Sequence, residues 1–224
     1  MFMDASQSPV TGQPQANKVR LVLIREDGTE GGVLVIDGGP ERIGRGHGPP
    51  FDADAYLDID HAEFKATKEG LLIDDLDSLN GVYIKLEGRT ELRDQDSFRV
   101  GQELLHYEDL PEPTTTGDGT EKMGSPNPGY WGRVSVMASV DRACLAFPIK
   151  DDGVSIGRDS GDITFPDDGY VSGNHCRIIG DDEGVFLEDL GSSNGTYVRA
   201  RKDQSVPLGS LILVGQQLFR IDEG

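Results

Sequence analysis

The sequence predicts an all-β protein built from two antiparallel β-sandwiches that a flexible linker joins. Short apolar runs such as VRLVLI, VLVID and VYIKL recur every eight to twelve residues, separated by Gly, Pro, Asp and Asn. Glycine occurs 30 times and proline 12 times in 224 residues, which favours a turn-rich β protein. No long segment keeps an apolar period of 3.6 residues, so we expect no long helix.

Changes in composition divide the chain into four parts. Residues 1–17 hold little that could be buried and are expected to form a disordered tail. Residues 18–108 and 130–224 each carry one series of apolar runs, and each is predicted to form one sandwich. Residues 109–129 contain four prolines, four glycines and three consecutive threonines, which predicts a flexible linker.

The two series are copies of each other, because their landmarks recur at a constant offset. Gly44-Arg45 returns as Gly157-Arg158 after 113 residues, and His61 returns as His175 after 114. Asp75-Leu76, Ser78, Asn80-Gly81 and Val100-Gly101-Gln102 also return after 114 residues. We therefore expect both halves to adopt the same fold.

Charge and composition exclude several classes of function. The 21 Lys and Arg residues are outnumbered by 40 Asp and Glu, giving a net charge of −19, which argues against nucleic-acid or anionic-membrane partners. The apolar runs are too short to span a membrane, which predicts a soluble protein. The N-terminus lacks the features of a signal peptide, and Cys144 and Cys176 show no metal-binding spacing, so we expect a reducing, cytoplasmic compartment.

The second half carries Gly157-Arg158, then Ser172-x-x-His175, then Ser193-Asn194-Gly195-Thr196, all at strand-to-strand loops. In this order the motifs resemble the forkhead-associated (FHA) domain, a β-sandwich whose loops at one end bind phosphothreonine peptides. The resemblance covers nearly the whole chain, since the first half keeps the same scaffold. It implies a tandem FHA protein, without a fused kinase or membrane segment, that acts as a stand-alone bacterial adaptor.

The residue types suit phosphate recognition independently of the resemblance. Arg158 supplies a guanidinium, and Ser172 and Ser193 add hydroxyl or backbone donors for a phosphate monoester. Asn194 has both a donor and an acceptor with which to bracket the main chain of a bound peptide. The sequence therefore predicts a phosphopeptide site at these four residues.

Four further residues are expected to support that site. Gly195 permits the turn beside Asn194, and Gly157 and Thr196 complete the motif. The resemblance implies that His175 is architectural, its ring holding the Ser172 loop through a backbone hydrogen bond.

Simpler interpretations exist for several of these positions. Arg158 could be a surface arginine paired with Asp159 or Asp162, and Ser172, Ser193 and Asn194 could serve only as turn residues. Three basic residues follow the motif and suit either acidic residues of a bound peptide or a solvated loop. They are Arg199, Arg201 and Lys202.

The first half differs from the pattern at residues that would contact the phosphate. It retains Arg45, His61 and Asn80, but Asp58 replaces the motif serine and Leu79 replaces Ser193. A carboxylate about 4 Å from a phosphate is repelled by roughly 4 kcal/mol at an effective dielectric near 20. We therefore expect a degenerate site that does not bind phosphopeptides.

Three interpretations of Asp58 remain open. It could pair with Arg45 and fill the site from within, or it could join Asp52, Asp54 and Asp60 in an acidic face for a basic partner. It could also belong to a solvated acidic loop.

No enzyme is expected, because no metal-ligand spacing, dinucleotide loop or nucleophile motif is present. We accordingly expect no catalytic residues, no metal and no cofactor. The function predicted is a non-catalytic phosphothreonine-binding adaptor in Ser/Thr kinase signalling, whose partner is a phosphorylated protein, either a kinase or its substrate. The alternative is a phosphate-independent scaffold in which both sandwiches bind unmodified proteins.

The linker offers a possible phosphoacceptor. Thr115 lies in an acidic stretch with Asp118 at the third following position, which the FHA resemblance implies is often read. If phosphorylated, Thr115 could occupy the second sandwich of the same or a neighbouring chain, because a short tether raises the effective concentration to about millimolar. The alternative is that these threonines only make the linker soluble.

Overall fold

The computed structural model describes residues 17–224, so the disordered tail predicted for residues 1–17 lies almost entirely outside the described part. The all-β prediction is confirmed: the described residues form 19 strands and one 3₁₀ turn, η1 (Arg45–His47). All paired strands are antiparallel except the short β12–β13 pair. Between residues 17 and 224 no helix has the length and apolar character needed to cross a bilayer.

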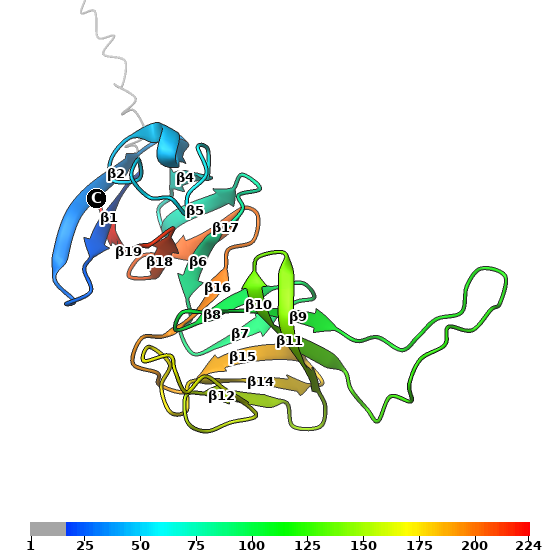
Figure 1. The fold of residues 1–224 in the computed structure, drawn as a ribbon. Helices are drawn as coiled ribbons and strands as arrows, with labels where there is room; N and C mark the ends of the chain where they lie inside the picture. The colour runs from blue at the N-terminus through cyan, green and yellow to red at the C-terminus, as the bar shows by residue number, and fades with distance from the viewer. Residues whose placement is uncertain (1–16) are drawn as a thin grey trace, which may run out of the picture.

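The strands form two sandwiches, which we call the first and the second sandwich (Figure 1). The first contains β1 (Lys18–Ile24), β2 (Glu30–Asp37), β3 (Glu41–Ile43), β4 (Ala62–Ala66), β5 (Gly70–Asp75), β6 (Val82–Lys85), β17 (Gln204–Pro207), β18 (Leu211–Val214) and β19 (Gln217–Glu223). The second contains β7 (Arg89–Leu92), β8 (Ser97–Val100), β9 (Glu103–Asp109), β10 (Gly132–Ser139), β11 (Arg142–Ile149), β12 (Val154–Gly157), β13 (Ile163–Thr164), β14 (Cys176–Asp181), β15 (Gly184–Asp189) and β16 (Thr196–Arg199).

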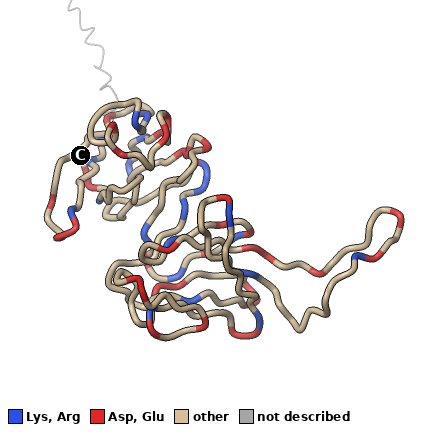
Figure 2. The backbone as a smooth tube through the Cα atoms, viewed as in Figure 1, with Lys and Arg blue, Asp and Glu red and all other residues tan. Residues whose placement is uncertain are grey.

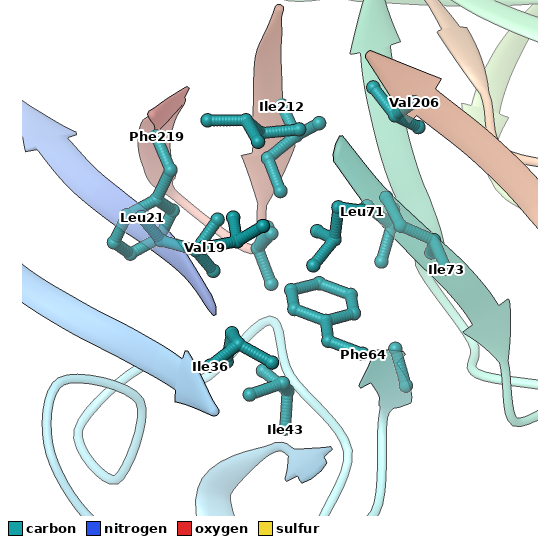
Figure 3. Packing of buried hydrophobic residues seen from close by; sticks show 14 of the residues in the cluster. Val19, Leu21, Ile36, Ile43, Phe64, Leu71, Ile73, Val206, Ile212 and Phe219 are labelled. Atoms are coloured by element: carbon teal, nitrogen blue, oxygen red, sulfur yellow. The ribbon is translucent and has the colours of Figure 1, made fainter. Parts of the chain in front are cut away.

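Each sandwich has its own hydrophobic core. In the first, apolar residues alternate with polar ones, as where Val19 and Leu21 point inward from β1 beside exposed Lys18 and Arg20. Figure 3 shows these residues packed against Phe64 from the opposite sheet and Phe219 from β19. The second core is built in the same way around Phe98, Leu105, Tyr107, Ile156, Ile178 and Leu187.

The two halves of the sequence exchange their last strands. β7 pairs with β15 and β8 with β16, whereas β17 pairs with β5 and β18 with β6. The second sandwich is thus a contiguous segment, from β7 to β16, inserted into a discontinuous first sandwich. The contiguous division into 18–108 and 130–224 therefore differs from the observed assembly, because the copied sequences make either set of strands compatible with either core.

The segment predicted to be the linker does not join the two sandwiches. Residues 110–131 connect β9 to β10, which pair with each other inside the second sandwich from Gly132↔Asp109 to Val136↔Leu105. Leu110 N–H donates to Trp131 O at 3.0 Å and closes the base of this loop. Figure 1 shows the loop projecting away from both sandwiches. The segments that join the sandwiches are instead the short connections 86–88 and 200–203.

The sandwiches meet where β6 and β16 pair and merge into one ten-stranded sheet. The pairing is nearly symmetric: Leu86 N–H donates to Thr196 O at 2.8 Å, and Ala200 N–H donates to Val82 O at 2.7 Å. The pairing satisfies strand edges that two separate sandwiches would leave open. Figure 2 shows Lys and Arg segments in this junction.

Candidate functional site

His175 ties together the loops at one end of the second sandwich. The ring is completely buried, and its Nδ1 accepts a hydrogen bond from Ser172 N–H at 3.0 Å. Nε2 must then carry the proton, which it donates to Gly195 O at 3.2 Å. Burial lowers the pKa of His175 and keeps the ring neutral. Through these two hydrogen bonds the ring connects the Ser172 loop to Gly195.

A second connection joins Ser172 to the loop of residues 192–195. Ser172 Oγ accepts a hydrogen bond from Ser193 N–H at 3.0 Å, which leaves the Ser172 hydroxyl proton free to donate. The Ser193 side chain is exposed beside it. Two hydroxyl groups from different loops therefore lie at the same end of the sandwich.

Gly157 brings the backbone of Arg158 against the Ser172 loop. A Cβ at Gly157 would lie 2.1 Å from Gly173 O, so only glycine allows the loop after Ser172 to cross this strand end. The neighbouring Arg158 N–H donates to Ser172 O at 2.8 Å. The close crossing explains why a glycine precedes the arginine.

The Arg158 side chain is 40% exposed and uses one of its nitrogens, Nε, to contact Asp159 at 3.0 Å. The other predicted partner, Asp162, instead accepts hydrogen bonds from the backbone and hydroxyl of Ser155. An exposed pair between neighbouring residues contributes at most about 1 kcal/mol. A phosphate dianion can therefore replace Asp159 as the partner of the guanidinium.

Asn194 is oriented for contact with a peptide main chain. Its Nδ2 donates to Tyr170 O at 2.8 Å, which fixes the amide and leaves Oδ1 free to accept a hydrogen bond. Gly195 follows with φ of 88°, a left-handed conformation that favours glycine. The Asn194 side chain itself is exposed.

Asp189 organises this loop from below and was not singled out as a site residue from the sequence. It accepts hydrogen bonds from the backbone of Gly191 and Ser192 and from the hydroxyls of Ser192 and Thr196, at 2.7 to 2.9 Å. Burial opposes ionisation, but these hydrogen bonds prevail and hold the pKa of Asp189 below its usual value. The repeat of Asp75-Leu76 as Asp189-Leu190 was the available sequence signal.

The first sandwich reproduces this framework with different chemistry. His61 is buried and receives Asp58 N–H at 3.2 Å, while its Nε2 lies 3.1 Å from Gly81 O. Asn80 donates to Tyr56 O at 2.8 Å, as Asn194 does to Tyr170. The backbone support of the loops is thus the same at both ends.

Asp58 does not pair with Arg45, which was one of the interpretations left open by the sequence. Arg45 Nε donates to Leu57 O at 2.6 Å, whereas Asp58 Oδ2 accepts Leu79 N–H at 2.7 Å. The carboxylate therefore takes the structural position of Ser172 Oγ. The carboxylate also adds a negative charge at a position where the second sandwich has a neutral hydroxyl.

The acidic face proposed from the sequence is also largely occupied. Asp54 is buried and accepts the backbone N–H groups of Tyr56 and Gln216. Asp60 contacts His47 at 2.7 Å and Arg42 at 3.5 Å, and the hydrogen bond from His47 lowers its pKa. Of the four carboxylates, Asp52 is exposed and its side chain makes no hydrogen bond or ion pair within residues 17–224.

Apolar side chains surround the altered site. Tyr56, Ile59 and Leu79 are 54%, 64% and 62% exposed, respectively. At the equivalent positions the second sandwich has Tyr170, Gly173 and Ser193, so two of the three positions change from small or polar to aliphatic. The loop end of the first sandwich is consequently more apolar than that of the second.

Two of the basic residues after the second motif contact residues from the first half of the sequence. Arg199 donates to Ser78 O at 2.7 Å, and Arg201 forms an ion pair with Asp96 and donates to Glu91 O at 3.0 Å. Two of the three basic residues are thus engaged at the junction of the sandwiches. The third, Lys202, is exposed.

The fold and the loop geometry define an all-β chain in which the loops around Ser172 and around Ser193 and Asn194, which we call the reader loops, meet at one end of the second sandwich. Residues 154–215 match the model of the FHA domain, generally a phosphothreonine-binding and non-catalytic module in signalling. The chain is also similar to the human E3 ubiquitin-protein ligase CHFR, with 36% identity over 94 residues. This match covers 39% of the chain and only 14% of CHFR.

The FHA match runs across the strand exchange. Residues 154–199 lie in the second sandwich, but β17 and β18, which complete the matched segment, lie in the first. In the second sandwich their positions are taken by β7 and β8. The motif residues all precede the exchange and remain together in one sandwich.

Proposed function

We propose that the chain is a non-catalytic adaptor whose second sandwich binds phosphothreonine peptides in Ser/Thr kinase signalling. The observation that carries the proposal is the joining of two loops by Ser172 Oγ and Ser193 N–H, beside Arg158, whose backbone N–H donates to Ser172 O and whose guanidinium is exposed. Arg158, Ser172 and Ser193 contact the phosphate, and Asn194 holds the peptide backbone. Partners are phosphorylated proteins, whether kinases or their substrates.

The proposal extends to a tandem arrangement in a reducing, cytoplasmic compartment. The equivalent hydrogen bonds of His61 and Asn80 support an FHA-like first sandwich with a degenerate site. Both cysteines are free, Cys144 exposed and Cys176 buried, which suits a reducing environment. The net charge of −19 supports protein rather than nucleic-acid or membrane partners.

The test is a titration of the full chain with a phosphothreonine peptide library and its unphosphorylated twin. Arg158→Ala removes at least two charge-assisted hydrogen bonds and should weaken phosphopeptide binding by about 100-fold. Arg177→Ala is the matched control, because Arg177 is an exposed arginine paired with Glu188 on the neighbouring strand. Equal affinity of the two variants, or binding that ignores the phosphate, would contradict the proposal.

A second candidate function concerns the first sandwich. The exposed Tyr56, Ile59 and Leu79 around its altered site favour contact with an unmodified protein segment. This is the scaffold alternative restricted to one sandwich. Binding of a partner that survives phosphatase treatment and Arg158→Ala, but is lost on Ile59→Ser, would support it.

Phosphorylated Thr115 would bind the second sandwich of another copy of the chain. It lies five residues beyond Leu110, so it can reach at most about 18 Å from the base of its loop. The reader loops are at the opposite end of β9, where Gln102 N–H contacts Asp168, and seven residues of strand span about 23 Å. Phosphorylated Thr115 is therefore expected to drive self-association, which Thr115→Ala would abolish in sedimentation experiments on kinase-treated protein.

A further inference from the structure

Lys85, from the first half of the sequence, lies on the reader loop of the second sandwich. It is the last residue of β6 and pairs opposite Tyr197 of β16. A Cβ at Gly195 would be 2.2 Å from Lys85 Cε and 3.0 Å from its Nζ. The space left by this glycine is therefore filled by the lysine, and the ammonium group ends beside Asn194-Gly195.

The equivalent cation at the first sandwich is Arg199, which is neutralised. It lies over Gly81, whose Cβ position is 2.4 Å from Arg199 Nε. Its guanidinium donates to Ser78 O at 2.7 Å and approaches Asp75 Oδ2 at 3.4 Å. The strand pairing thus delivers one basic side chain to the reader-type loop of each sandwich.

Lys85 differs from Arg199 because its potential partner is already satisfied. Asp189, the counterpart of Asp75, is held by the hydroxyls of Ser192 and Thr196, both at 2.7 Å. In the first sandwich Val82 replaces Thr196 and leaves Asp75 available to the arginine. Within residues 17–224 no carboxylate lies within 4.0 Å of the half-buried Lys85 ammonium.

We infer that Lys85 is a specificity-determining residue that selects phosphopeptides with Asp or Glu on the side of the phosphothreonine held by Asn194. The inference rests on the proposed function. An acidic chain otherwise repels acidic peptides, so an unpaired cation on the loop supplies the complementary charge. Its partial burial reduces screening by salt. Peptide preference in the second sandwich is then set by a residue from the other sandwich.

The test compares phosphothreonine peptides that carry a single Glu or Gln at each flanking position, titrated into the full chain. Wild-type protein should bind one Glu peptide about fivefold more tightly than its Gln twin. Lys85→Gln should remove this difference without changing the affinity for the Gln peptide, and Lys85→Arg should keep it. Lys65→Gln, an equal charge change at an exposed lysine of β4, should also keep it.

The outcomes separate this inference from the proposed function. If the wild-type protein binds no phosphopeptide, both the proposed function and the role of Lys85 are overturned. Phosphopeptide binding without a Glu preference, or a preference that persists in Lys85→Gln, would overturn the role of Lys85 alone. A thermal unfolding curve of Lys85→Gln that matches wild type ensures that the change reports on recognition.

Discussion

The Asp58 carboxylate accepts a hydrogen bond from Leu79 N–H at 2.7 Å. In the second sandwich the same bond is made by Ser172 Oγ and Ser193 N–H at 3.0 Å. A carboxylate and a hydroxyl can thus serve equally well in closing the two loops. They differ in charge, and we expect the carboxylate to repel a phosphate dianion that the hydroxyl could bind.

The first site should gain phosphate binding when its chemistry is restored. Asp58→Ser keeps an acceptor for Leu79 N–H, so the free energy of unfolding should change by less than about 1 kcal/mol. Combined with Leu79→Ser in an Arg158→Ala background, it should make phosphothreonine binding by the first sandwich measurable in a calorimetric titration. If the folded variant binds no phosphopeptide, the carboxylate is not what excludes phosphate.

Stability should fall when the pH drops below the ordinary histidine value of about 6.5. Burial lowers the pKa of His175, against the opposing effects of Gly195 O and the charges of Asp189 and Asp168. The unfolded chain then takes up a proton before the folded one, so His175 favours unfolding as the pH falls and is neutral in effect above this range. Urea unfolding between pH 8 and 5.5 measures this loss, and His175→Gln should reduce it. An unchanged pH profile in that variant would contradict the assignment.

The same protonation state predicts a specific NMR signature. Nδ1 accepts Ser172 N–H, so His175 should be the neutral tautomer with the proton on Nε2. Long-range ¹H–¹⁵N spectra at pH 7 distinguish the two ring nitrogens. A proton on Nδ1 would mean that the ring does not hold the Ser172 loop.

Local features were predictable from the sequence, and long-range pairing was not. The apolar alternation of β1 and the motif loops around His61 and His175 depend on neighbouring residues and short spacings, which the sequence displays directly. The sequence does not show which sandwich β7–β9 join, because β17–β19 are copies of these strands and fit the same positions. The place of Lys85 on Gly195 follows from the pairing of β6 with β16, a long-range contact between the two copies that the sequence does not display.

After the chain is cut in the 110–131 loop, the two fragments should remain associated. A protease site inserted between Gly117 and Asp118 would separate the halves covalently, yet β1–β19, β5–β17, β7–β15 and β9–β10 would still pair between the fragments. The fragments should therefore co-elute at the intact size in size-exclusion chromatography and separate only in denaturant. Separation under native conditions would show that each half keeps its own strands.

A matched pair of core substitutions should reveal which sandwich each strand supports. Leu92 in β7 and Val206 in β17 are equivalent positions, 3% and 1% exposed, in the second and first cores, respectively. Leu92→Ala should destabilise the second sandwich by about 2 to 5 kcal/mol, although it lies in the first half of the sequence. Val206→Ala should weaken the first.

Hydrogen exchange can assign these losses to a sandwich. Leu92→Ala should accelerate exchange in β14 and β15, whereas Val206→Ala should accelerate it in β4 and β5. The reverse assignment would mean that the strands are not exchanged. Because Leu92 belongs to the core of the second sandwich, which carries the reader loops, its substitution should also weaken phosphopeptide binding, and Val206→Ala should leave it closer to wild type. A substitution in the first half that impairs a site in the second would then follow directly from the insertion of one sandwich into the other.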